Sequence, residues 1–432
     1  MKYYSLNHQS TLTDFKEATI RGQAPDKGLY FPEFIPLADK ELIEHIESYS
    51  NEEIAFKIIK PYVAGLIPDD KLKEIVTETI NFSIPLVKVK EDIYSLELFH
   101  GPTLAFKDVG ARFMSRCLGY FVKDKKQKVT VLVATSGDTG GAVANGFYGV
   151  EGVEVVILYP SGKVSSVQEK QLTTLGKNIH ALEVKGNFDD CQQMVKQAFA
   201  DETLTSKLFL TSANSINVAR WLPQQIYYFL AWKQWPFKNQ PPVICVPSGN
   251  FGNICAGMLA NQSGLPVKKF IAACNANDII PNYLSSGELK LKPAVATISN
   301  AMDVANPSNF IRVMELFHQQ IDETKAMLEA CSVDDAATKR TIKEVYEQYH
   351  YLIDPHTAVA YKAMDDYLQK HPGDKGIIIS TAHPVKFPEV VEEEIGHAIE
   401  LPEQVKYIVT KESIKRTINT DYKELSSYLM NM

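Results

Sequence analysis

The chain has 432 residues, of which 45% are hydrophobic and 22% charged, and its formal net charge is −7 at pH 7. Because a single hydrophobic core rarely extends beyond about 250–300 residues, this length predicts two or more lobes. The acidic balance argues against a nucleic acid or another polyanion as partner, although a locally positive pocket can still bind a phosphorylated small molecule. The short basic run Lys123, Lys125, Lys126 and Lys128 is interpreted as a helix end in solvent.

The six cysteines predict neither disulfides nor a metal site. None forms a Cys-x-x-Cys pair and none has a histidine partner at metal-ligand spacing, so we interpret them as buried thiols in a reducing compartment. No apolar run approaches the roughly 20 residues of a membrane helix, and the first residues lack the apolar stretch of a signal peptide. We therefore expect a cytoplasmic protein without a metal or a membrane partner.

Residues 1–80 are predicted to be mostly helical and to form an N-terminal domain. Apolar residues recur at helical spacing in 38–47, 51–61 and 69–79, and proline residues such as Pro61 punctuate these segments. From about residue 85 the pattern changes to short apolar strands that alternate with helices.

The segment 99–112 contains the most informative side chain of the sequence, Lys107. It lies where a loop with Gly101 and Pro102 meets a helix whose apolar residues repeat at helical spacing. The predicted buried face consists of Phe113, Met114, Cys117, Leu118, Phe121 and Val122. A lysine in the first turn faces the positive end of the helix dipole, which disfavours its charged form, whereas Asp108 stabilises the ammonium. A neutral amine in an enclosed site reacts with aldehydes, so Lys107 is a candidate nucleophile; the alternative is a solvated surface lysine.

Seven short apolar strands are predicted in the remainder of the chain. They are Val129–Ala134, Val153–Tyr159, Asn178–Val184, Leu208–Thr211, Val243–Val246, Lys269–Cys274 and Gly376–Ser380. Strands without polar alternation, separated by helices, are typical of parallel sheets covered on both faces. Two such runs predict two α/β lobes with a ligand cleft between them, the smaller lobe at about 108–215 and the larger one built from the flanking segments.

Three of the predicted strands end in small polar residues. The first continues into Ser-Gly-Asp-Thr-Gly-Gly at 136–141, the second into Ser-Gly-Asn-Phe-Gly-Asn at 248–253, and the third into Thr-Ala-His-Pro at 381–384. Glycine lets the backbone approach a ligand closely, and the helix that follows each of the first two loops presents free N–H groups to an anion. The two loops are therefore candidate anion cradles, with ordinary tight turns as the alternative. Neither loop fits a nucleotide P-loop or a Gly-x-Gly-x-x-Gly fingerprint well.

These motifs together resemble those of threonine synthases of the longer microbial and fungal type. The resemblance rests on His-Gly-Pro-Thr-Leu-Ala-Phe-Lys-Asp at 100–108, Thr-Ser-Gly-Asp-Thr-Gly at 135–140 and Pro-Ser-Gly-Asn-Phe-Gly-Asn at 247–253. Ser-Asn-Ala-Met-Asp-Val at 299–304 and Asp-Pro-His-Thr-Ala-Val at 354–359 fit the same family. The resemblance implies a pyridoxal-phosphate enzyme of fold type II, the tryptophan synthase β type. In that fold two α/β lobes with parallel-rich sheets surround a cofactor cleft, here as a catalytic region at 81–432 after the N-terminal domain.

The resemblance also implies roles for individual side chains. Lys107 would hold pyridoxal 5'-phosphate as a Schiff base, and the hydroxyl of Thr381 would bind the pyridine nitrogen. The cofactor phosphate would lie in a cradle formed by Gly249, Asn250, Phe251, Gly252 and Asn253. The substrate carboxylate and the phenolic oxygen of the cofactor would meet Ser136, Asp138 and Thr139. The substrate phosphate would bind Asn214, Ser215 and Arg220, for which a capped helix start is the alternative interpretation.

Two positions depart from the patterns of relatives. Position 253 is asparagine where relatives often have aspartate, so a role is expected for its backbone N–H and not for its side chain. Position 138 is aspartate where the broader fold usually has asparagine. A carboxylate beside a substrate carboxylate needs a shared proton or another partner.

The implied reaction converts O-phospho-L-homoserine and water to L-threonine and phosphate, with Lys107 as the general base, and completes threonine biosynthesis. The nearest alternative is a serine or threonine dehydratase, or a lyase that acts on O-phosphothreonine. A catalytically silent relative that senses an amino-acid phosphate is the alternative from another class. We expect a monomer, because no exposed apolar stripe is evident.

Overall fold

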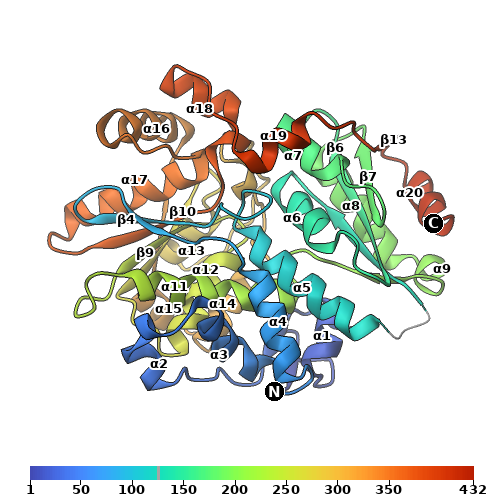
Figure 1. The fold of residues 1–432 in the computed structure, drawn as a ribbon, viewed down its shortest axis with the longest axis horizontal. Helices are drawn as coiled ribbons and strands as arrows, with labels where there is room; N and C mark the ends of the chain where they lie inside the picture. The colour runs from blue at the N-terminus through green and yellow to red at the C-terminus, as the bar shows by residue number, and fades with distance from the viewer. Residues whose placement is uncertain (124–126) are drawn as a thin grey trace. The chain divides into compact units, whose positions relative to one another are not determined.

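A computed structural model describes residues 1–123 and 127–432, which fold into two compact units (Figure 1). Both units are discontinuous in sequence, and each is described by itself. Unit 1 consists of Met1–Phe31, Lys107–Arg220 and Leu401–Met432, and unit 2 of Pro32–Phe106 and Trp221–Glu400.

Unit 1 is built around a five-stranded parallel sheet in the order β13-β7-β6-β5-β8. Its strands are β5 (Val129–Ala134), β6 (Val153–Pro160), β7 (Ile179–Val184), β8 (Phe209–Thr211) and β13 (Arg416–Ile418). Alternate strand residues such as Leu132, Val156 and Leu182 pack against α8 and α20, and the residues between them, such as Val133 and Ile157, are equally buried. Helices therefore cover both faces of this sheet.

The helices of unit 1 connect these strands. They are α1 (Phe15–Arg21), α5 (Lys107–Val122), α6 (Asp138–Phe147), α7 (Ser166–Thr173), α8 (Phe188–Ala200), α9 (Glu202–Thr205), α10 (Val218–Trp221), α19 (Glu403–Val409) and α20 (Tyr422–Met430). A short two-stranded sheet joins β1 (Tyr3–Ser5) and β2 (Tyr30–Pro32).

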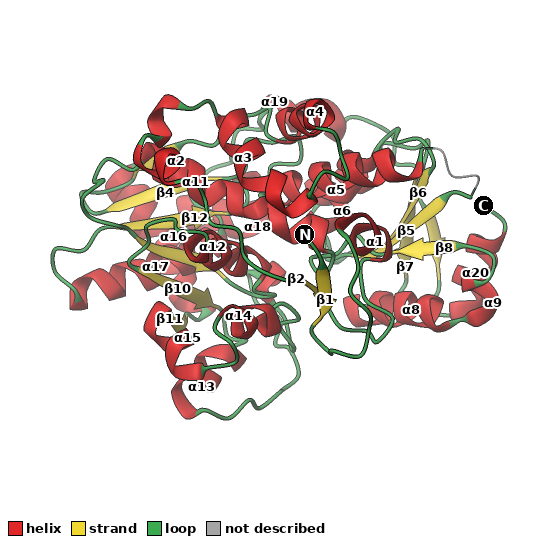
Figure 2. Ribbon diagram, turned by 90° about the horizontal axis from the view of Figure 1, so that it is seen from below, coloured by secondary structure: helices red, strands yellow, loops and turns green. Residues whose placement is uncertain are grey.

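Unit 2 contains a six-stranded sheet in the order β11-β10-β9-β12-β4-β3, parallel throughout except for the β3–β4 pair (Figure 2). Its strands are β3 (Leu86–Lys88), β4 (Ile93–Glu97), β9 (Val243–Pro247), β10 (Lys269–Cys274), β11 (Leu328–Ser332) and β12 (Gly376–Ser380). Because β4, β9 and β12 are parallel neighbours, the loops that leave their carboxyl ends start at the same edge of the sheet. This edge carries the candidate site residues of unit 2.

The helices of unit 2 cover its sheet, and α17 packs on one face, where it shares a core with Val243, Ile271 and Ile378. The helices are α2 (Lys40–Glu44), α3 (Asn51–Val63), α4 (Asp69–Thr79), α11 (Gln225–Gln234), α12 (Gly252–Gln262), α13 (Ile279–Ser286), α14 (Phe310–Leu316), α15 (Ile321–Met327), α16 (Asp335–Tyr349), α17 (Pro355–Lys370) and α18 (Pro388–Ile395). Single turns of 3-10 helix occur at Ile46–Ser48, Leu222–Gln224, Asn300–Met302 and Pro384–Lys386.

The predicted fold class is confirmed, and all seven predicted strands are present within one residue at each end. The sequence pattern does not predict the remaining strands of the described residues, which are β4 and β11 and the three-residue strands β1, β2, β3 and β13. The three predicted N-terminal helical segments are present, but Pro61 does not end its helix, since α3 continues to Val63. The predicted end of α5 is confirmed at Val122, with Lys123 exposed, while Lys125 and Lys126 of the basic run lie outside the described residues. Among the described residues, no helix combines the length and the apolar character that crossing a membrane requires.

Candidate active site

Lys107 is the first residue of α5, as predicted, and it is half-buried. All six apolar residues of the predicted helix face are buried, so packing of that face determines the orientation of the helix. Asp108 is also buried, at 1% exposed surface. Lys107 opens the second segment of unit 1 and follows directly after Phe106, the last residue of a segment of unit 2.

The loop that precedes Lys107 is bound to the segment after β12 by consecutive backbone contacts. The N–H of Phe106 donates to the carbonyl of Thr381 at 2.8 Å, and Ala105 forms an isolated bridge with Ala382. The N–H of His383 donates to the carbonyl of Leu104 at 3.0 Å. The residue before Lys107 is therefore fixed beside Thr381, which is itself buried.

Two side chains hold the same loop in unit 2. The fully buried Lys386 donates from Nζ to the carbonyl of Thr103 at 2.8 Å, and the hydroxyl of Tyr227 donates to the carbonyl of Phe106. Leu104 adopts a left-handed conformation with φ of 56°, which costs free energy for a residue with a side chain. These contacts hold that conformation in place.

His383, two residues after Thr381, is held as a neutral imidazole. Its Nδ1 accepts from the N–H of Val385 at 3.1 Å. Burial and, to a smaller extent, the neighbouring His100 lower the pKa of His383 to about 4. A neutral ring with Nδ1 as acceptor carries its proton on Nε2.

The second glycine loop connects β9 to α12 and has the geometry of an anion cradle. Phe251 is left-handed with φ of 62°, and α12 begins at Gly252 without a side-chain cap. In the part of the chain that the structure describes, no protein group accepts from the N–H of Gly252 or of Asn253. These amides at the positive end of the helix dipole are suited to a phosphate.

Close packing behind this cradle requires glycine at position 249. A Cβ there would lie 2.6 Å from the Cα of Met302, a backbone atom that cannot move aside cheaply. Asn250 accepts at Oδ1 from both the N–H and the hydroxyl of Ser308, at 2.7 and 2.8 Å. Asn253 uses its side chain within the loop, since Nδ2 donates to the carbonyl of Pro247 at 2.8 Å. Only its backbone N–H is left for a ligand.

The first glycine loop, in unit 1, is organised by Thr135 and Gln168. Thr135 Oγ1 accepts from the N–H groups of Gly137 and Gly140, both at 2.9 Å. Gly137 has φ of 136°, a conformation that favours glycine, and a Cβ there would meet the amide group of Gln168 at 2.5 Å. Asp138 begins α6, is 5% exposed, and accepts at Oδ1 from Nε2 of Gln168 at 2.9 Å.

This contact explains how a carboxylate is accommodated at position 138. The amide of Gln168 and the positive end of the α6 dipole both stabilise the charged form of Asp138. Ser136 and Thr139, on either side of it, are half-buried. Sequence reasoning missed Gln168, although the Ser165–Gln168 spacing is that of a capping box and the box is present at α7.

The segment predicted to bind the substrate phosphate lies in unit 1 beside α5. Asn214 and Ser215 are half-buried, whereas Arg220 is buried, and its Nη1 donates to the carbonyl of Ala213 at 3.0 Å. A Cβ at Gly110 of α5 would lie 2.7 Å from the carbonyl oxygen of Arg220, so the segment packs tightly against the helix that Lys107 begins.

The predicted site residues are thus gathered in two groups. Unit 1 contains Lys107, Ser136, Asp138, Thr139, Asn214, Ser215 and Arg220, and unit 2 contains Gly249, Asn250, Phe251, Gly252, Asn253 and Thr381. The groups in unit 2 fit pyridoxal phosphate chemically, since unpaired amides at a helix start suit its phosphate and a neutral hydroxyl suits its pyridine nitrogen.

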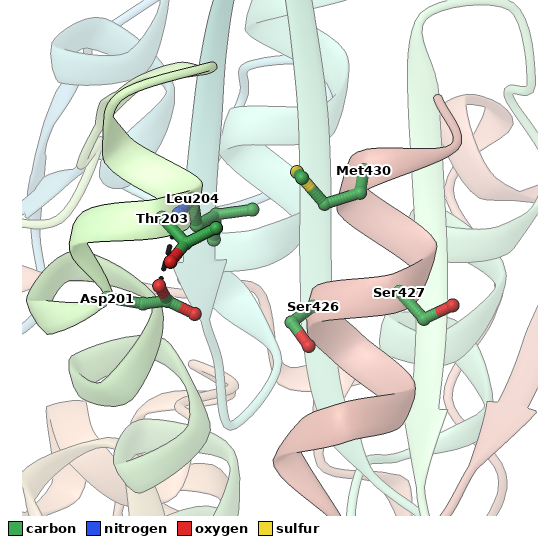
Figure 3. Close-up of a pocket in the computed structure, with 6 residues that line it drawn as sticks. All are labelled: Asp201, Thr203, Leu204, Ser426, Ser427 and Met430. Carbon is green, nitrogen blue, oxygen red and sulfur yellow. Dashed lines mark hydrogen bonds between the residues drawn. The ribbon is translucent and has the colours of Figure 1, made fainter.

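A separate surface hollow of unit 1 lies between α9 and α20 (Figure 3). It contains none of these residues. Asp201, which faces it, already accepts from the N–H of Leu204 at 3.1 Å and from the hydroxyl of Tyr422 at 2.7 Å. The carboxylate of Asp201 therefore caps the start of α9 and binds Tyr422.

Comparisons with known proteins cover the whole chain. Residues 78–381 match the family "Pyridoxal-phosphate dependent enzyme", residues 2–80 match "Threonine synthase N terminus", and residues 357–429 match "Threonine synthase, C-terminal". Threonine synthase from Escherichia coli is 44% identical over 432 residues, covering 100% of both chains.

Solved structures agree with these matches. The crystal structure of pyridoxal-phosphate-bound threonine synthase from Brucella melitensis is similar with a TM-score of 0.93 and 33% identity, covering 100% of this chain and 99% of that one. Maize serine racemase, at 18% identity and a TM-score of 0.54, covers 81% of this chain and 94% of its own, a likeness that shows the fold alone.

Proposed function

Because the chain belongs to the threonine synthase family of pyridoxal-phosphate enzymes, we propose that Lys107 is its covalent anchor for the cofactor and its catalytic base. Its function is that of a threonine synthase, a lyase that converts O-phospho-L-homoserine and water to L-threonine and phosphate. When bound, pyridoxal phosphate supplies an electron-accepting ring conjugated to the substrate nitrogen. The protein supplies position, charge and proton transfer.

Apart from the anchor Lys107, the residues that bind the cofactor in this proposal belong to unit 2. The N–H groups of Gly252 and Asn253 bind its phosphate, with Gly249, Asn250 and Phe251 shaping the loop, and the Thr381 hydroxyl binds the pyridine nitrogen. A neutral hydroxyl leaves that nitrogen without a full positive charge. Support comes from the unpaired amides at the start of α12 and from the position of Thr381 beside Phe106.

Unit 1 holds the substrate. Ser136 and Thr139 donate to its carboxylate, and Asp138 orients the loop through Gln168. Asn214 and Ser215 bind the substrate phosphate, and the buried guanidinium of Arg220 stabilises the charge that develops as phosphate leaves. Lys107 Nζ, once released from the cofactor, removes the proton from Cα of the substrate. It then transfers protons at other carbon atoms in the later steps of the reaction.

One observation carries the assignment of Lys107: the residue before it is hydrogen-bonded to Thr381 while Lys107 itself begins α5. Borohydride reduction followed by peptide mapping tests it. We expect the cofactor on Lys107 and on no other lysine, and K107A to lose the yellow colour of the wild-type protein. A label on another residue, or none, would overturn the proposal.

Product analysis distinguishes the reaction from that of a dehydratase. With O-phospho-L-homoserine we expect equal amounts of phosphate and threonine, and 2-oxobutanoate as the main product would contradict the proposal. The exposed Lys290, changed to methionine, is a control for the loss of a lysine that is not the anchor. It should keep reducible cofactor on Lys107.

We also propose that the protein acts in the cytoplasm as a monomer, with residues 1–80 as an N-terminal domain and 81–432 as the catalytic region. Light scattering of the purified protein tests whether it is a monomer. Limited proteolysis tests the boundary near residue 80.

A further inference from the structure

We propose that His356 is a positioning residue that shapes the phosphate cradle through the loop at 299–303. His356 is buried in unit 2 and is hydrogen-bonded through both ring nitrogens. The proposal rests on the proposed function, since it takes the loop at Gly249–Asn253 as the phosphate site. It gives a role to two motifs, at 299–304 and 354–359, to which the proposed function assigns no step.

The hydrogen bonds determine which nitrogen of His356 carries the proton. Nδ1 lies 2.6 Å from Oδ2 of Asp354, and Nε2 lies 3.1 Å from the backbone nitrogen of Ala301. A backbone N–H can only donate, so Nε2 must be an unprotonated acceptor, and the ring proton lies on Nδ1. His356 and Asp354 are 3% and 0% exposed, which makes an unpaired group at either nitrogen costly.

Asp354 is suited to hold this tautomer because it only accepts. As the N-cap of α17, it accepts from the N–H groups of His356 and Thr357, both at 3.0 Å, and from the Thr357 hydroxyl. The start of α17 therefore determines where the imidazole lies.

The loop held by His356 forms the back of the cradle. Ala301 precedes Met302, whose Cα is the atom that a Cβ at Gly249 would approach to 2.6 Å. Further along, Ser308 binds the Asn250 side chain, and the N–H of Asn309 donates to the Asn250 carbonyl at 3.2 Å. Two consecutive cradle residues are thus packed against this one segment.

Other contacts anchor the loop independently of Ala301. Asp303 accepts from Nδ2 of Asn275 at 2.8 Å and from the N–H of Thr297 at 3.0 Å. Loss of the Ala301 contact should therefore loosen the loop locally at Met302 and Gly249 and leave the rest of unit 2 folded.

Two substitutions separate the hydrogen bond to Ala301 from the volume of the ring. In H356Q the side-chain oxygen can take the place of Nε2 and accept from Ala301, whereas in H356N the shorter amide can reach Asp354 but not Ala301. Both lose the ring contact with Phe387, whose centroid lies 4.8 Å away. We expect H356N to raise the dissociation constant of pyridoxal phosphate about tenfold and H356Q by less than about threefold.

A comparison with pyridoxal, which lacks the phosphate, gives a readout that general destabilisation would not produce. H356N should weaken the binding of pyridoxal by less than about twofold, because its effect acts through the phosphate cradle. Equal weakening of both ligands, or equal behaviour of H356N and H356Q, would overturn the inference. A wild-type protein that does not prefer pyridoxal phosphate over pyridoxal would instead overturn the proposed phosphate site.

A measurement on the wild-type protein keeps the inference testable if H356N does not fold. The ¹⁵N chemical shifts of its histidines, assigned by the signal missing in H356Q, should show Nδ1 protonated and Nε2 unprotonated at His356 near neutral pH. A proton on Nε2 would contradict the contact with Ala301 and with it the inference.

Discussion

Lys107 is placed by the residues that precede it as much as by its own helix. Packing of the apolar face orients α5, but the backbone position of its first residue follows from Phe106, Ala105 and Leu104, each bound to the segment after β12. A catalytic amine needs such definition, because an error of about 1 Å in the reacting geometry can cost two orders of magnitude in rate.

Gln168 was not predicted as a site residue, but its side chain donates a hydrogen bond to Asp138. In Q168L the buried carboxylate loses a donor, so we expect the free energy of unfolding to fall by about 1–3 kcal/mol. The KM for O-phospho-L-homoserine should rise about tenfold, because the loop shifts. Urea denaturation and steady-state kinetics measure these effects.

The dissociation constant of pyridoxal phosphate serves as the control for Q168L. It should stay within about twofold of wild type, since the cofactor phosphate is assigned to the other glycine loop. An unchanged KM in a destabilised protein would contradict a substrate role for the loop that carries Asp138.

His383 predicts a pH dependence of stability. Its pKa in the folded protein is about 4, below the ordinary value of 6.5, so the unfolded chain binds the proton more readily. This contribution to stability is complete at neutral pH and is lost as the pH falls from about 6.5 towards 4. Between pH 7 and pH 5 the loss should be about 2 kcal/mol.

H383N is the matched comparison for this titration, because the asparagine oxygen can still accept from the N–H of Val385 but does not titrate. In urea denaturation at several pH values, the free energy of unfolding should depend more steeply on pH in wild type than in H383N. Equal slopes of the free energy of unfolding against pH in the two proteins would show that the burial of His383 does not control the titration.

At the scale of elements, the sheets were predictable where strands are continuously apolar. β4 begins at the apolar Ile93 but contains the polar residues Ser95 and Glu97, so it does not form a continuous apolar run and was not predicted. β11 was not predicted for the same reason, because it contains Glu329 and Ser332. Pro61 lies within α3 without ending it, since the helix is held by burial of Ile58, Ile59 and Tyr62.

The cradle between β9 and α12 depends on close backbone packing, and Gly249→Ala tests it. The added methyl would lie 2.6 Å from the Cα of Met302, so the loop must move. We expect the dissociation constant of pyridoxal phosphate to rise at least about tenfold, measured by absorbance titration of the apoprotein.

Gly264→Ala is the control for this substitution. Gly264, just beyond the other end of α12, has φ of 101° and nothing within 4 Å of an added Cβ. It should lose about 1 kcal/mol of stability without a change in cofactor binding. Equal effects of the two variants on binding would contradict the cradle assignment.

At the scale of the molecule, both units are discontinuous, and the proposed cofactor and substrate residues are divided between them.

A ligand that binds only the folded chain stabilises it by mass action. At a free concentration one hundred times the dissociation constant, pyridoxal phosphate should add about 2.7 kcal/mol, visible as a higher Tm. At the same concentration of pyridoxal phosphate, the Tm of K107A should rise less than that of the wild-type protein. An equal rise in Tm would contradict a covalent anchor at Lys107.

The sequence by itself determined the seven continuously apolar strands, the start of α5 at Lys107 and the two glycine loops, because these depend on local periodicity and on residue types at fixed spacing. The site roles came from a resemblance to a family and stay proposals. Only the tertiary structure decided which distant residues meet: Gln168 on Asp138, Thr381 beside Phe106, and His356 on Ala301, which is 55 residues away in the chain. Such pairs follow from strand order and helix packing, which no local pattern encodes, because each depends on how the whole sheet is assembled.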